Sequence, residues 1–125
     1  MDFINSKKQG DFGLGMAIAH FVSNGHTVSI PLSDSQEYDI VVDIDGKLNK
    51  IQVKTTSYVR NGFHEVTIKT CGGNKSSNTI KKFKGENVDY IFITTTSGDK
   101  YLIPTDLGFP SHSLKLGKKY QKFMV

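Results

Sequence analysis

Apolar residues recur at helical spacing near the start of the chain and at alternate positions over much of the remainder. In residues 11–24 an apolar face is formed by Leu14, Ala17, Ile18, Phe21 and Val22. This i, i+3, i+4, i+7, i+8 spacing predicts one long helix, which Gly25 would end. Gly13 and Gly15 inside it each cost the helix about 0.8–1 kcal/mol relative to Ala, which suggests that a neighbouring segment approaches closely.

Period-two alternation predicts that most of the chain after this helix forms strands. We expect strands at 26–32, 38–44, 47–56, 64–70 and 88–96, and one more that ends at Pro104. A short helix is expected near 78–84. This order predicts an α+β fold in which a mixed β-sheet core is flanked by helices.

An Asp45-Gly46 pair separates two of these alternating runs, which is the strongest short-range signal for a β-hairpin. If the loop has two residues, Asp39 faces Gln52 across the ladder, and Lys54 lies two residues further along the same face. One face of the hairpin would then carry a carboxylate, an amide and an ammonium. The alternative is a solvated face with an incidental Asp–Lys pair, which needs no function.

Length, charge and cysteine content narrow the class of protein. We expect a single domain over residues 1–125. The net charge of +4 and the pI near 9.1 are compatible with nucleic-acid binding.

No apolar run approaches the ~20 residues of a membrane span, and no secretory signal is apparent. Cys71 is the single cysteine, so no internal disulfide can form. We expect a cytoplasmic protein without membrane contact.

Part of the sequence resembles the group I intron-associated homing endonucleases of the PD-(D/E)XK nuclease superfamily. The resemblance spans roughly residues 7–104 and is carried by "GDFGLGMAIAHFVSNGHTVSIPLSDSQEYDIVVDIDGKLNKIQVKTT" at 10–56, "GGNKSS" at 72–77 and "YLIP" at 101–104. Asp39 followed by Gln52-Val53-Lys54 is similar to the superfamily's acid and acid-X-Lys pattern, in a Gln-X-Lys form. The resemblance implies a restriction-endonuclease-like fold and metal-dependent, site-specific cleavage of double-stranded DNA.

The resemblance also implies roles for these residues. Asp39, the Gln52 amide oxygen and the Val53 carbonyl would hold Mg²⁺ or Mn²⁺, and Lys54 would lie beside the attacking water and the scissile phosphate.

One feature of the first helix departs from the resemblance. Some relatives carry Glu at the position of Leu14, which here belongs to the apolar helix face. Asp11, one turn earlier, either supplies a catalytic carboxylate in its place or serves only as the N-cap of the helix.

DNA contacts are expected from cations and from a glycine-rich polar loop. The candidates are Lys7, Lys8, Arg60, Asn74, Lys75, Ser76, Lys81 and Lys82.

One site cuts one strand, so we expect a homodimer or homotetramer. Two alternatives remain: a junction resolvase or nicking repair nuclease of the same core, and a catalytically weakened DNA-binding module, which the missing helix acid favours.

Overall fold

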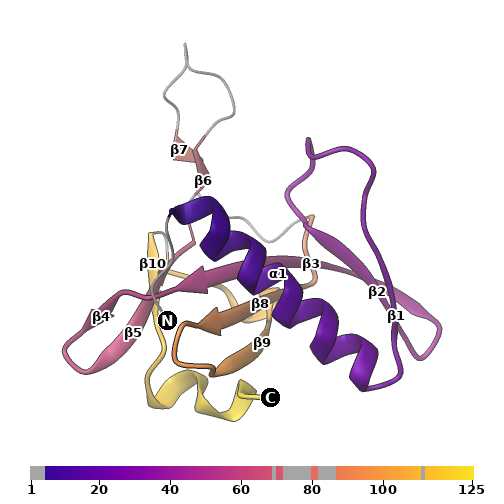
Figure 1. Ribbon diagram of the computed structural model, residues 1–125. Coiled ribbons are helices and arrows are strands. Elements are labelled where there is room, and N and C mark those ends of the chain that lie inside the picture. Colours follow the sequence, from indigo (N-terminus) through magenta and orange to yellow (C-terminus); the bar gives the residue numbers. More distant parts are fainter. Residues whose placement is uncertain (1–4, 69, 72–79, 82–86, 111) are drawn as a thin grey trace.

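A computed structural model shows one long helix lying across a mixed β-sheet (Figure 1). The structure describes residues 5–68, 70–71, 80–81, 87–110 and 112–125. The elements are α1 (Ser6–Ser23), β1 (Thr27–Ser29), β2 (Ile40–Ile44), β3 (Lys47–Thr56), β4 (Val59–Arg60), β5 (Phe63–Thr67), β6 (Thr70–Cys71), β7 (Ile80–Lys81), β8 (Tyr90–Thr95), β9 (Lys100–Pro104), the 3₁₀ helix η1 (Thr105–Leu107), β10 (Ser113–Lys115) and the 3₁₀ helix η2 (Lys118–Phe123).

The main sheet has five strands in the order β1-β2-β3-β8-β9. β3 and β8 are parallel, and every other neighbouring pair in it is antiparallel. A second, three-stranded sheet has the order β10-β5-β4, and β6 pairs with β7. The mixed α+β sheet is therefore confirmed. Within the described residues, however, a single α-helix covers one face, whereas strands and the η2 turn pack on the other.

The helix begins five residues earlier than expected. Asn5 is its N-cap, with a side chain that accepts a hydrogen bond of 2.9 Å from the Lys8 amide. Asp11 is exposed within the helix, so the alternative that made it the N-cap is wrong. The first turn, Ser6–Gln9, is entirely polar, and apolar periodicity therefore could not reveal it. The buried stripe is Gly13, Ala17 and Phe21, whereas Val22, expected on it, is 56% exposed.

Gly13 brings α1 close to the centre of the sheet. A Cβ atom there would overlap the Thr55 hydroxyl and would lie 3.2 Å from the Thr55 Cβ. The close approach that the helix glycines suggested is confirmed for Gly13. It is not found at Gly15, where a Cβ would meet nothing within 4 Å. Gly13 therefore determines how tightly α1 packs on β3.

Two apolar cores lie on opposite faces of the main sheet. On the helix side, Ile51 packs with Ala17, Phe21 and Phe92. On the other side, the core is built from β5, β8, β9, β10 and η2, with Ile93 among its members. Because alternate residues of a strand point to opposite faces, Gln52 and Lys54 lie on the side away from α1.

The region after β5 differs from expectation. The strand expected over 64–70 is divided into β5 and β6. Ile80–Lys81 form a strand paired with Thr70–Cys71, so the helix expected near 78–84 is wrong at these two residues. The rest of that segment lies outside the described residues.

Candidate active site

The site is built on the β2–β3 hairpin, whose predicted register is confirmed. Ile44 pairs with Lys47, which leaves Asp45 and Gly46 as a two-residue loop. Their φ angles are 53° and 88°, and this pair of positive values is what a type I′ hairpin turn requires. The Gly46 amide also donates to the Asp43 carboxylate over 2.9 Å.

Asp39 lies just outside the paired ladder, which corrects the expected cross-strand pair with Gln52. β2 begins at Ile40, paired with Ile51, and the Asp39 amide donates to the Ile51 carbonyl over 2.9 Å. The Asp39 carboxylate in turn accepts a 2.7 Å hydrogen bond from the Val53 amide. With no strand residue of β2 opposite it, that amide needs an acceptor, and the carboxylate supplies one. Asp39 is thus held against the backbone of the strand that carries Gln52 and Lys54.

Gln52 is a buried polar residue in this site. It is 6% exposed, and its Oε1 atom has no hydrogen-bond partner. Buried acceptors are normally paired, and an unpaired one costs about 1–3 kcal/mol. An oxygen held in this way is suited to a ligand that arrives with positive charge or with a donor hydrogen.

Asp39 and Lys54 influence each other's protonation. Partial burial raises the pKa of the Asp39 carboxyl group, while the Val53 amide and the Lys54 charge act in the opposite direction. Burial lowers the pKa of the Lys54 ammonium, and the Asp39 charge opposes this. In both groups desolvation outweighs the attraction between them, so each charged form is held at a cost in free energy that a bound ion or phosphate could offset.

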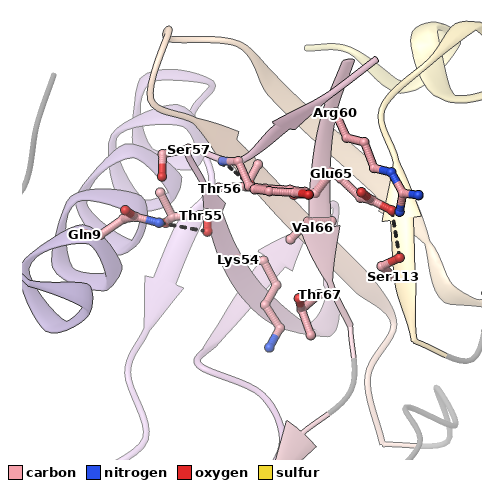
Figure 2. Close-up of a pocket in the computed structure, with 11 residues that line it drawn as sticks. Gln9, Lys54, Thr55, Thr56, Ser57, Arg60, Glu65, Val66, Thr67 and Ser113 are labelled. Atoms are coloured by element: carbon pink, nitrogen blue, oxygen red, sulfur yellow. Dashed lines mark hydrogen bonds between the residues drawn. The ribbon is translucent and has the colours of Figure 1, made fainter. Parts of the chain in front are cut away.

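The Lys54 side chain lines a cleft of about 490 Å³ between β3 and the second sheet (Figure 2). Figure 2 shows Lys54 beside Thr67 at one end, and Arg60, Glu65 and Ser113 at another. Gln9 of α1 closes a third side and donates from Nε2 to the Thr55 carbonyl over 3.3 Å. The cleft is therefore lined by residues from both sheets and from the first turns of the helix.

Some predicted residues lie away from this cleft. Asp11 is exposed on α1 and, like Asp39 and Gln52, is not among the residues that line the cleft. Leu14 packs against the helix-side core as expected. Lys7 and Lys8 are exposed on the first turn of α1.

The other DNA-contact candidates divide into three groups. Arg60 lines the cleft. Lys81 lies in β7, where only the backbone is described. Asn74, Lys75, Ser76 and Lys82 lie outside the described residues.

Sequence reasoning missed Glu65 as a cleft residue. Its carboxylate accepts a 2.9 Å hydrogen bond from the Ser113 hydroxyl, and its carbonyl accepts one of 2.6 Å from the Thr56 hydroxyl. Alternation did place Glu65 on a strand. That this strand would cross β3 beside Lys54 depends on long-range contacts, for which the local pattern holds no signal.

A divalent cation fits the donor set of the site. Among the described residues, no group of three or more His, Cys, Asp and Glu side chains could hold a metal. The oxygens on offer are the Asp39 carboxylate, the unpaired Gln52 Oε1 and the Val53 carbonyl. One carboxylate with neutral oxygens and water is a coordination set that Mg²⁺ accepts.

Gln52 and Lys54 thus share one face of β3, and Asp39 is hydrogen-bonded to the Val53 amide between them, inside a mixed α+β fold. The sequence profile of the PD-(D/E)XK endonuclease family matches residues 4–122, and the chain belongs to that family. A bacterial homing endonuclease, I-Ssp6803I, has the same restriction-endonuclease-like fold. The two share 23% sequence identity and a TM-score of 0.69, over 94% of this chain and 80% of the other. No curated protein matches the sequence. Within the described residues, no helix is long and apolar enough to cross a membrane.

Proposed function

We propose that this nuclease is a metal-dependent, site-specific endonuclease of the homing type that hydrolyses phosphodiester bonds of double-stranded DNA. The observation that carries the proposal is the placement of Gln52 and Lys54 on one face of β3, with Asp39 hydrogen-bonded to the intervening Val53 amide and a buried Gln52 oxygen that lacks a partner. Membership of an endonuclease family supports the reaction class. The homing type is supported by the sequence resemblance over 10–56 and by the fold shared with a bacterial homing endonuclease.

The metal would be Mg²⁺, or Mn²⁺ in its place, held by the Asp39 carboxylate, Gln52 Oε1 and the Val53 carbonyl. When bound, such an ion stabilises the charge of the transferring phosphoryl group and lowers the pKa of a water molecule. The Val53 amide fixes the Asp39 carboxylate through its 2.7 Å hydrogen bond, which limits the motion of the principal ligand.

Lys54 acts on the substrate side of this arrangement. Its ammonium lies in the cleft, where a DNA phosphate would replace water as its partner. Because Lys54 is half-buried, its charge offsets negative charge in the transition state more strongly than a fully solvated lysine would.

The DNA would be held by the cations and loop residues around the cleft. We assign phosphate contacts to Lys7, Lys8 and Arg60, and further contacts to Asn74, Lys75, Ser76, Lys81 and Lys82. Two copies are needed to cut both strands, so the active form would be a homodimer or homotetramer working in the cytoplasm.

A second candidate is a DNA-binding module with weakened catalysis. It is favoured by Leu14, which stands where some relatives carry Glu and packs against the helix-side core. Asp39 would then be the only carboxylate ligand from the described part of the chain.

Cleavage of a randomised duplex library separates these two functions. With Mg²⁺, wild-type protein should produce double-strand ends at one recurring sequence, and EDTA should abolish them. Lys54→Met should lower the rate at least about 100-fold, the effect of removing one transition-state donor. Lys47→Met is the matched control, because Lys47 is exposed at the hairpin turn, and it should retain the wild-type rate.

The same assay can contradict the proposal. Cutting confined to a four-way junction would indicate a resolvase, and single-strand nicks would indicate a repair enzyme. Duplex binding with no cleavage in Mg²⁺ or Mn²⁺ would establish the binding module instead.

A further inference from the structure

The active-site cleft does not end at Arg60 and Glu65. A smaller depression of about 170 Å³ shares both residues and adds Asn61 and Lys115. A third, of about 410 Å³, shares Glu65, Ser113 and Lys115 and continues to η2. The three depressions adjoin one another through these shared lining residues, and we call the series, which leads from Lys54 across the second sheet, the furrow.

Cations are distributed along the whole furrow. We define the basic track as the lining residues Lys54, Arg60, Lys115, Lys118 and Lys119. Only one acidic residue lines it, within the described part of the chain: Glu65, whose carboxylate accepts a hydrogen bond from the Ser113 hydroxyl. Five positive charges therefore outnumber one negative charge along a surface that begins at the candidate catalytic lysine.

Aromatic rings lie close to two of the cations at the far end of the furrow. The Lys115 Nζ lies 4.6 Å from the centroid of the Phe63 ring, and the Lys119 Nζ lies 5.4 Å from that of Tyr120. Lys115 also pairs with Glu65 in the β10–β5 ladder, which ties its position to the cleft. A lysine positioned over a ring loses less side-chain entropy when it binds a phosphate.

We propose that the phosphodiester backbone of the DNA flanking the cleaved bond runs along the basic track. This inference rests on the proposed function and adds the direction in which the substrate leaves the cleft. A series of cations along one surface matches a polyanion with regularly spaced charges, and Lys recognises phosphate as a point charge. The Phe63 ring already lies under Lys115, so the track is suited to the backbone of a duplex rather than to stacked, unpaired bases.

Salt-dependent binding tests the track directly. A labelled duplex of random sequence, about three helical turns long, would be titrated by anisotropy in EDTA at a series of salt concentrations. The slope of log K against log[salt] falls in magnitude by about 0.9 for each phosphate contact that a substitution removes. Lys115→Gln combined with Lys118→Gln should therefore reduce the magnitude of the slope by about 2. Lys118→Gln alone, which leaves the Lys115–Phe63 contact intact, should reduce it by about 1.

The control variant also removes two positive charges, but at positions outside the basic track. Lys47 lies at the hairpin turn, and Lys100 lines a depression beside α1. Lys47→Gln combined with Lys100→Gln should leave the slope close to wild type. If the track pair and the control pair give equal slopes while the wild type binds normally, the basic track is refuted but the proposed function is not. Tighter binding of single strands than of the duplex would also overturn it. Failure of the wild type to bind any duplex would instead refute the proposed function.

Discussion

Replacing Gln52 by Met should stabilise the metal-free protein, although the substitution removes a polar group from the candidate active site. Gln52 is 6% exposed and its Oε1 atom has no partner. An unpaired buried acceptor costs about 1–3 kcal/mol, which the thioether avoids. A volume-conserving exchange costs less than about 1.5 kcal/mol in packing. The expected result is a net gain of about 1 kcal/mol in the free energy of unfolding.

Urea unfolding followed by circular dichroism measures this gain. With a slope of about 1–3 kcal/mol per molar urea, the midpoint in EDTA should rise by roughly 0.3–1 M. Mg²⁺ should then reverse the order. At about ten times its Kd, a ligand stabilises the native state by about 1.4 kcal/mol, and the variant should forfeit much of this because one ligand oxygen is gone.

Gln36→Met is the control for a satisfied amide. The Gln36 Nε2 donates to the Ser33 carbonyl over 2.6 Å, so this variant should be less stable than wild type by about 0.5–1.5 kcal/mol. If Gln52→Met is also less stable in EDTA, the Gln52 oxygen is already satisfied and the reasoning fails. If Mg²⁺ stabilises wild type and Gln52→Met equally, Gln52 is not a metal ligand.

Two further predictions concern the helix contact and the carboxylate. Gly13→Ala places a methyl group against Thr55, whereas Gly15→Ala meets nothing, so the first should be less stable than the second by about 1–3 kcal/mol in urea unfolding. Equal stabilities would show that α1 can shift away from β3 at no cost. Asp39→Asn should abolish cleavage but retain duplex binding, as gel shift and library cleavage would report. Its stability relative to wild type should also rise as the pH increases from acid to neutral. The folded-state pKa of Asp39 is raised, so the native wild type is penalised only once that carboxyl group ionises. A constant difference across this range would contradict the assigned direction of the pKa shift.

Local signals in the sequence were sufficient for the hairpin. Asp45 and Gly46 are residue types that adopt positive φ, and alternation fixes which side chains share a face. The register that brings Gln52 and Lys54 to one side could therefore be predicted from the turn and the strand pattern alone. The start of α1 could not, because its first turn is polar and its cap, Asn5, lies outside the periodic segment.

The tertiary structure decided the parts of the site that depend on residues distant in sequence. β8 lies parallel to β3 and covers its far edge, and β5 crosses beside Lys54 and brings Glu65 into the cleft. Asp39 binds the Val53 amide instead of facing Gln52, because β2 begins one residue too late to satisfy that amide. By itself, the sequence determined the hairpin and the face that Gln52 and Lys54 share, since turn type and alternation are local properties. Only the packing of distant strands determined the cleft and the basic track, because no local pattern encodes which segments will meet.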